Sequence, residues 1–229
     1  MNAHSFPAMP APARALTRRP ARDVHAARGD KRDRILAAAT RVFARHGFFG
    51  AQVADIAREA GVAAGTVYLY FRGKDDLLAS IFEKTMASAI ADGREALAGI
   101  DAPEERLRRI ARLHLARLGA DRDLAVVFQV ELRQTTKFME QFSRSGLGTY
   151  LGIIQQTIEA GQKNGSIRKT INARTAAKVF FGALDEMATN WVLSERSYDL
   201  AGDADDVVSL VVHGLAAPPR AAAARHPRR

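Results

Sequence analysis

The chain has 229 residues, of which 47% are hydrophobic, so it has enough apolar material for one large domain or two modest ones. The absence of cysteine excludes disulfides and thiolate metal sites. Because no apolar run is long enough for a transmembrane helix and the N-terminus lacks a secretory signal pattern, we expect a cytoplasmic protein without a membrane partner.

The formal net charge of +9 is unevenly distributed along the chain. Residues 1–30 carry +3, residues 31–80 carry +3 and residues 217–229 carry +4, whereas residues 81–216 carry −1. A basic N-terminal part joined to a near-neutral larger part is typical of a protein that binds a polyanion locally. A nucleoid packaging protein, in contrast, would carry positive charge over its whole body.

The sequence predicts an all-α protein between two disordered basic ends, an arm over residues 1–29 and a tail over residues 217–229. Between these ends, apolar residues recur at helical spacing, and no stretch alternates in the manner of a β-strand. The predicted helices cover residues 30–46, 52–60 and 63–70, a segment that begins near Lys74, and residues 104–118, 121–142, 146–163, 172–195 and 203–216.

Several helix ends carry recognisable boundary residues. Asp, Asn and Pro favour the first turn of a helix, and Gly favours the position after its last turn. The expected N-caps are Asp101 (followed by Pro103 in the first turn), Asp121 and Asn172. The glycines expected to follow a helix are Gly47, Gly61 and Gly165.

Residues 51–70 have the pattern of a helix-turn-helix, in which a short helix, a tight turn and a second helix present one face to the DNA major groove. Ile56 and Val67 are apolar where the two helices must pack, and Ala57 is small where their backbones approach. Gly61 stands at the turn, where only glycine adopts a positive φ without strain. This segment therefore predicts DNA binding.

The second helix of this motif has little bulk at its start and hydroxyl groups beyond it. Gly65 and its neighbouring alanines allow the backbone to approach DNA, and the hydroxyls of Thr66, Tyr68 and Tyr70 suit phosphate contacts. Lys74 begins the next helix, where the helix dipole also favours a phosphate. Taken singly, each tyrosine also fits a half-buried helix position, and Lys74 also fits a solvated surface cation. The order and spacing of these residues together favour the DNA-binding interpretation.

The sequence GVAAGTVYLYFRGKDDLL, residues 61–78, resembles the TetR-family signature, and the resemblance extends over residues 31–82. It implies a three-helix DNA-binding domain over residues 30–84, followed by a ligand-binding and dimerisation domain over residues 85–216. The residues that it places at DNA are Gln52, Ala63, Ala64, Gly65, Thr66, Tyr68, Tyr70 and Lys74.

Within that set, the resemblance implies that Ala64, Gly65 and Thr66 face bases and that the tyrosines and the lysine hold phosphates. The chain departs from the family pattern twice. It has Ala51-Gln52 where the family often has Thr, and Ala63 where the family often has Ser. Each departure removes a capping hydroxyl that contributes about 1 kcal/mol to helix stability.

The segments 125–134 and 182–193, together with Tyr198-Asp-Leu, are similar to one branch of this family, the FadR-type regulators of fatty-acid degradation. The resemblance implies a repressor of β-oxidation genes that binds no cofactor and leaves its operator when long-chain acyl-CoA binds. An acyl chain requires a long apolar tunnel between helices, and the phosphates of CoA require Arg or Lys at its mouth.

Candidate ligand residues follow from that requirement, although apolar stripes on helices also serve as core or dimer interface. The apolar candidates are Phe128, Leu132, Phe180, Phe181, Leu184 and Trp191. The cationic candidates are Arg106, Arg109, Arg133 and Lys137.

A homodimer is expected because one recognition helix reads too few base pairs, whereas a dimer reads the two half-sites of a palindromic operator. The predicted interface is formed by the helices over 172–195 and 203–216. The apolar face of the final helix comprises Val207, Val208, Leu210, Val211 and Leu215.

Two further alternatives remain at this point. An enzyme is disfavoured because no nucleophile elbow, phosphate-binding loop or zinc-protease motif occurs. A TetR-type repressor of an efflux pump or another pathway would instead sense a different hydrophobic ligand. For a cationic drug, Glu131, Asp185 and Glu186 are the candidate acidic partners.

Overall fold

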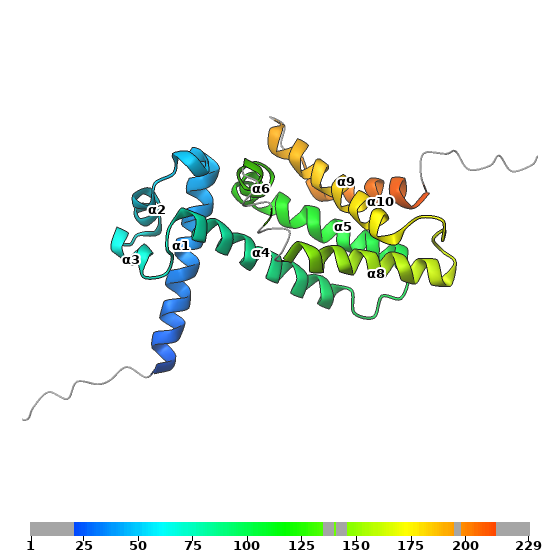
Figure 1. Ribbon diagram of the computed structural model, residues 1–229, viewed down its shortest axis with the longest axis horizontal. Helices are drawn as coiled ribbons and strands as arrows, with labels where there is room; N and C mark the ends of the chain where they lie inside the picture. Colours follow the sequence, from blue (N-terminus) through cyan, green and yellow to red (C-terminus); the bar gives the residue numbers. More distant parts are fainter. Residues whose placement is uncertain (1–20, 135–139, 141–145, 195–197, 214–229) are drawn as a thin grey trace, which may run out of the picture.

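The computed structural model describes residues 21–134, 140, 146–194 and 198–213, with side chains from residue 29 onward, and its regular elements over these ranges are all helical (Figure 1). The all-α prediction is confirmed. The α-helices are α1 (Ala21–Gly50), α2 (Val53–Ala60), α3 (Ala64–Tyr68), α4 (Lys74–Ala96), α5 (Pro103–Ala120), α6 (Arg122–Gln129), α8 (Gly148–Asn164), α9 (Ala173–Leu193) and α10 (Ala204–His213). Two 3₁₀ helices are η1 (Glu131–Gln134) and η3 (Leu200–Asp203). Within the described ranges, every helix is too short or too polar to cross a bilayer.

The first three helices and the beginning of α4 form an N-terminal unit at one end of the molecule (Figure 1). Phe43 of α1, Ile56 of α2, Val67 of α3 and Leu77 of α4 have no exposed surface, so all four helices contribute to one core. Gly61 has a φ of 65°, and its N–H group bonds the last carbonyls of α2. The predicted packing and turn of the helix-turn-helix are therefore confirmed.

α4 connects the two ends of the molecule (Figure 1). Its Phe82 belongs to the N-terminal core and stacks on Phe128 of α6 at a centroid distance of 4.8 Å, whereas Leu97, just beyond α4, belongs to the second core. The predicted domain boundary between residues 84 and 85 thus falls inside a continuous helix. The two units share a rigid element rather than a linker.

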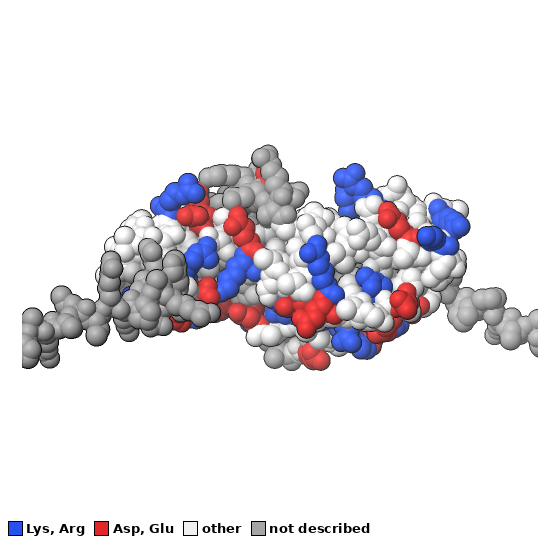
Figure 2. All heavy atoms as spheres, turned by 90° about the horizontal axis from the view of Figure 1, so that it is seen from below, with Lys and Arg blue, Asp and Glu red and all other residues white. Residues whose placement is uncertain are grey.

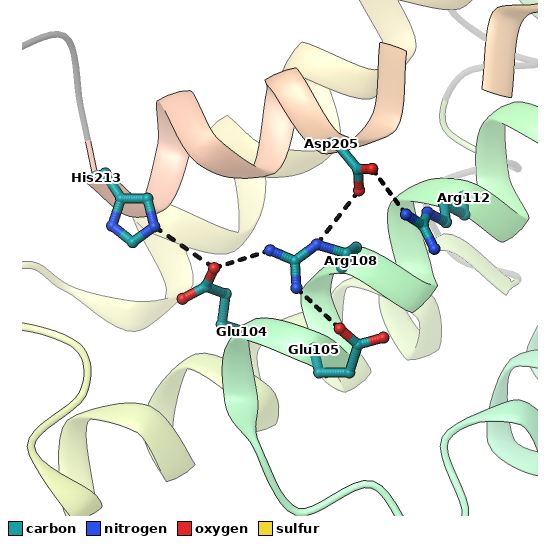
Figure 3. A network of polar contacts seen from close by, with 6 residues as sticks. All are labelled: Glu104, Glu105, Arg108, Arg112, Asp205 and His213. Carbon is teal, nitrogen blue, oxygen red and sulfur yellow. Dashed lines mark hydrogen bonds and ion pairs between the residues drawn. The ribbon is translucent and has the colours of Figure 1, made fainter. Parts of the chain in front are cut away.

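The remaining helices α5, α8, α9 and α10 form a second bundle, the C-terminal unit (Figure 1). α10 packs against α5, with Val207 and Val208 buried between helices. Figure 3 shows the ion pairs along this contact: Arg108 contacts Asp205 at 3.3 Å, and Arg112 contacts the other oxygen of the same carboxylate at 2.7 Å. The face of the last helix predicted to form the dimer is therefore used largely within the chain.

Two predicted helix starts are wrong. α1 begins at Ala21, so the segment 21–29 that we predicted to be disordered is helical. The N-cap of α5 is Ala102 rather than Asp101, because Pro103 takes the first helical position and holds the preceding residue extended. Asp121 and Asn172 are N-caps as predicted, since each side chain accepts a backbone N–H bond.

The helix predicted over residues 121–142 ends at Gln129, and the 3₁₀ helix η1 follows. Neither Gly nor Pro marks this break. The break coincides with a tertiary contact, since the Glu131 side chain just beyond it is buried against the backbone of the N-terminal unit, as described below. Residues 135–139 and 141–145, which include the candidate Lys137, lie outside the described residues, as do Leu215 and the tail.

Charged side chains of both signs are interspersed on the face shown in Figure 2, without one dominant basic patch. This distribution agrees with the near-neutral charge of residues 81–216. It does not suit indiscriminate coating of a polyanion by the whole body.

Candidate nucleic-acid interface and ligand cavity

α3, the second helix of the helix-turn-helix, begins with small, exposed residues. Ala63, Ala64 and Gly65 are exposed, and the space around Gly65 is empty to 4 Å from an added Cβ. Tyr68 is 59% exposed although it is aromatic. An exposed tyrosine beside small residues leaves room for a duplex backbone to approach α3 closely.

The starts of α2 and α3 have extended N-cap residues, Gln52 and Ala63, and neither makes a side-chain cap bond. The predicted loss of two capping hydroxyls is therefore observed. Gln52 is exposed, whereas Thr66 is half-buried, and its N–H group donates to the Ala63 carbonyl at 2.8 Å. Tyr70 is half-buried and packs against the N-terminal core, so the two predicted tyrosines differ in exposure.

The candidate Lys74 is held by the backbone at the end of α1. Its Nζ donates to the carbonyl of Phe48 at 2.8 Å and to that of Phe49 at 3.1 Å, and it lies 5.0 Å from the centre of the Phe48 ring. Sequence reasoning missed this contact because the two segments are distant in sequence. Lys74 therefore fixes the start of α4 to the end of α1.

An ion pair also fixes α1 to α2. Glu59 accepts bonds from Arg41 at 2.6 Å and from Arg45 at 2.5 Å. These hydrogen bonds, first that of Arg45 and then that of Arg41, lower the pKa of the Glu59 carboxyl below its ordinary value. The carboxylate therefore remains charged at neutral pH and orients α2 on α1.

Glu131 of η1, which follows α6, reaches the backbone at the end of α1. Its side chain is 5% exposed, and its Oε2 accepts the N–H group of Phe48 at 2.6 Å and the side-chain amide of Gln134 at 2.8 Å. A buried carboxylate is tolerated only when it is well hydrogen-bonded. The contact therefore defines how η1 docks on the end of α1.

A cavity of about 680 Å³ lies between α4, α5, α6, η1, α8 and α9. A volume of this size suits a small organic ligand. Its apolar lining comprises Met86, Ala89, Leu97, Ile110, Leu113, Ala116, Leu118, Ala120, Leu124, Phe128, Leu132, Leu147, Ile153, Ile154 and Phe181.

Four of the predicted ligand residues line this cavity, namely Phe128, Leu132, Arg133 and Phe181. Phe180 and Leu184, on the same helix as Phe181, have no exposed surface and belong to the packed core.

The remaining candidates lie elsewhere. Trp191 is packed in the core, and its indole N–H donates to the Tyr198 carbonyl at 3.0 Å. Arg106 donates to the carbonyls of Leu97 and Ile100 at 3.0 Å each and lines a separate, polar hollow of about 500 Å³. Arg109 is exposed on α5 and is absent from the lining of the cavity.

Polar side chains that the sequence analysis did not select also line the cavity. Gln129 of α6 donates to Asp185 of α9 at 3.1 Å, and Arg133 donates to the same carboxylate and to Gln129. Arg117 of α5 forms an ion pair with Asp92 of α4. Both carboxylates are therefore neutralised by an arginine.

The third polar group of the lining is a histidine–tyrosine pair. His114 Nδ1 of α5 lies 3.1 Å from the hydroxyl of Tyr150 of α8. Burial lowers the pKa of His114 to about 4 and raises the pKa of Tyr150. Both side chains are therefore neutral at pH 7. The sequence did not reveal this pair, because helical periodicity identifies the inward face of a helix but not the positions on it that border a cavity.

Comparison with known proteins finds two family models that match the chain. Residues 35–81 match the model of "Bacterial regulatory proteins, tetR family", and residues 82–214 match that of "YsiA-like protein, C-terminal region". The chain is 36% identical over 181 residues to a fatty acid metabolism regulator protein of Bacillus subtilis, covering 79% of this chain and 93% of that protein.

Two solved structures are also similar. One, the fatty acid degradation regulator FadR from Bacillus halodurans, has a TM-score of 0.78 and 37% identity, covering 81% of this chain and 96% of the other. The second, FadR from Bacillus subtilis in complex with stearoyl-CoA, has a TM-score of 0.77 and 34% identity, covering 80% and 99%.

The geometry of Lys74 predicts that it contributes to stability independently of any bound nucleic acid. Replacement of Lys74 by Met removes two charge-assisted hydrogen bonds, so the free energy of unfolding in urea should fall by about 1–3 kcal/mol. Arg72→Met is the control, since that side chain is 95% exposed, and it should change stability little. Equal stability of the two variants would contradict this assignment.

Proposed function

The chain belongs to the TetR family of bacterial regulatory proteins, and we propose that it is a transcriptional repressor that binds a palindromic operator as a homodimer and is released by long-chain acyl-CoA. Its target genes are those of fatty-acid degradation, and its proposed site of action is the cytoplasm, where bacterial DNA lies. The observation that carries the proposal is the apolar cavity of about 680 Å³ in the C-terminal unit.

The DNA part of the proposal rests on the exposed face of α3. Ala64 and Gly65 leave the backbone accessible to base edges, with Thr66 beside them, and Tyr68 extends from the same helix toward a phosphate. Gln52 at the start of α2 and Tyr70 after α3 flank this surface. Lys74 has two of its three N–H groups committed to carbonyls, which leaves one for a phosphate.

The effector part rests on the chemistry of the cavity. An acyl chain fits a lining made chiefly of aliphatic and aromatic side chains from several helices, and it needs no charge partner there. Arg117 and Arg133 lie at the cavity wall with partly exposed side chains, where the phosphates of CoA would find cations. The FadR of Bacillus subtilis, to which the chain is similar, has been solved with stearoyl-CoA.

A physical route from the cavity to DNA runs through Glu131. Its neighbours Leu132 and Arg133 line the cavity, while its own carboxylate holds the Phe48 N–H group. The carbonyl of Phe48 in turn accepts from Lys74, at the start of the helix that follows α3. An acyl chain that displaces η1 therefore changes the support of α3, and the ligand shifts the population toward a form that binds the operator weakly.

For the homodimer, we propose the outer face of α9 as the central contact. Val179 is 58% exposed and Leu193 is 70% exposed on this helix, which is unusual for large apolar side chains. Leu210 of α10 is 49% exposed and extends the apolar surface. The proposed interface uses α9 and α10, as the sequence analysis expected. It is formed by apolar side chains on these helices that are exposed rather than buried in the C-terminal core.

The alternative of a sensor for cationic drugs is disfavoured by the acidic side chains themselves. Glu131 accepts the Phe48 N–H group, and Asp185 is paired with Arg133. Glu186 is exposed on α9 and accepts the amide of Asn190 at 2.7 Å. A cation in the cavity would compete with an existing arginine for Asp185.

Tyr68 should contribute to affinity for DNA of every sequence, since a phosphate contact carries no base information. The Tyr68→Ala variant should bind all duplexes about tenfold more weakly, as expected for the loss of one hydrogen bond to a charged group. Fluorescence anisotropy with a duplex selected by the protein from a random pool, and with a scrambled duplex, measures both affinities. Tyr198→Ala, at an exposed tyrosine of the C-terminal unit, is the control and should bind as the unmodified protein does.

Stearoyl-CoA should dissociate the protein–DNA complex, whereas CoA alone and a cationic dye should not. Ala89 and Ala91 of α4 provide a matched pair of variants, because Ala89 lines the cavity and Ala91 is exposed. Ala89→Phe fills part of the cavity, so half-release should require at least about tenfold more stearoyl-CoA, while Ala91→Phe should respond normally. Release by the dye alone, or equal responses of the two variants, would refute the effector assignment.

A further inference from the structure

His114 is a half-buried side chain of the cavity whose second ring nitrogen, Nε2, is buried and unused. Its Nδ1 lies beside the Tyr150 hydroxyl, but Nε2 is buried and has no hydrogen-bond partner among the residues that the structure describes. Such orphan groups are rare in folded proteins and often mark the place of a ligand or water. His114 lines the cavity, so a ligand that enters it and shifts the side chains over Nε2 can satisfy this nitrogen.

The Tyr150 hydroxyl lies beside Nδ1 and so influences which nitrogen of the ring carries the proton. Burial raises the pKa of Tyr150, so its phenol keeps its proton and can donate it to His114 Nδ1 across 3.1 Å. A neutral imidazole whose Nδ1 accepts a bond carries its hydrogen on Nε2. In that tautomer Nε2 is a donor, and none of the described residues offers it an acceptor.

The surroundings of the ring favour an uncharged acceptor. The rings of Tyr150 and Phe181 have their centres 5.8 Å from that of His114, and desolvation lowers the pKa of His114 to about 4. Asp185 and Arg117 are the charged groups that act on it. A carboxylate would lose its hydration here without gaining a cationic imidazole, whereas a carbonyl oxygen loses less.

Arg117 lies three residues beyond His114 on α5, so the two side chains share one face of the helix about 5 Å apart along its axis. Arg117 lines the same cavity but is partly exposed and pairs with Asp92 across the gap between α4 and α5. The arrangement places an uncharged donor inside the cavity and a cation nearer its surface. An acyl thioester has this order of polarity, an uncharged carbonyl followed by a polar arm.

We propose that His114 Nε2–H donates a hydrogen bond to the carbonyl oxygen of the acyl thioester and so makes the cavity selective for thioesters. Tyr150 acts on this bond indirectly, as the residue that fixes the tautomer and orientation of the ring. The assignment rests on the proposed acyl-CoA function. It adds the group that distinguishes an acyl-CoA from a free fatty acid or from an alkyl chain of equal length.

The first test uses the unmodified protein and two ligands that differ at one carbon. Stearoyl-CoA has the carbonyl, and the S-octadecyl thioether of CoA has a CH₂ group in its place. Isothermal titration calorimetry should give an affinity about tenfold higher for stearoyl-CoA, because the thioether leaves Nε2–H without an acceptor. Equal affinities would overturn the proposal while leaving acyl-CoA sensing intact.

The second test removes the proposed hydrogen-bond donor from the protein instead of removing the acceptor from the ligand. In His114→Phe, the tenfold difference between the two CoA ligands should fall to about onefold, and the affinity for the thioether should be retained. Tyr150→Phe keeps the imidazole but not the hydroxyl, and it should reduce the difference only in part. The affinity for free stearate should be unchanged in His114→Phe, since its carboxylate does not use this donor.

The possible outcomes distinguish a failure of the thioester contact from a failure of the proposed function. If neither CoA ligand binds the unmodified protein, the proposed function fails, and the thioester contact fails with it. If both bind and the tenfold difference persists in His114→Phe, the contact alone is refuted. The titration of the unmodified protein decides the matter even where a variant folds poorly.

Discussion

The hydrogen bond between the Glu131 carboxylate and the Phe48 N–H group joins two parts of the molecule that are 83 residues apart in sequence. A carboxylate that is 5% exposed has lost most of its hydration, so its position depends on the donors that surround it. Removing those donors would leave a buried charge uncompensated. The docking of η1 on the end of α1 is therefore tightly specified, and the geometry of both units depends on it.

This constraint gives the cavity a mechanical connection to the proposed DNA-binding surface. Residues adjacent to Glu131 line the cavity, and Lys74 contacts the carbonyl of the same Phe48 whose N–H group Glu131 holds. α4 adds a second connection, since it starts at Lys74 and continues to Met86 and Ala89 in the cavity wall. Packed interfaces of this kind change between discrete arrangements rather than deform gradually, which suits a ligand-controlled switch.

The sequence predicted the parts of the fold that depend on local chemistry. The packing of Ile56 on Val67 and the positive φ of Gly61 follow from residue type and spacing, and the structure confirms them. The interruption of the helix after Gln129 could not be predicted, because no Gly or Pro marks it and the contact beside it joins Glu131 to the amide of the distant Phe48. In the same way, the pattern of α9 identified Phe180, Phe181 and Leu184 as inward-facing but could not show that only Phe181 borders the cavity. His114 and Tyr150 were missed because neither is unusual until the fold brings them together.

In the proposed mechanism, one coupling free energy links ligand binding in the cavity to operator binding at the DNA surface, and such coupling is reciprocal. The direct measurement is the affinity for stearoyl-CoA with and without saturating operator, together with the affinity for operator with and without saturating stearoyl-CoA. The account predicts that each ligand weakens the other by the same factor, and that Glu131→Ala moves both factors toward one. Stearoyl-CoA that binds with the same affinity to the free protein and to the DNA complex would contradict it.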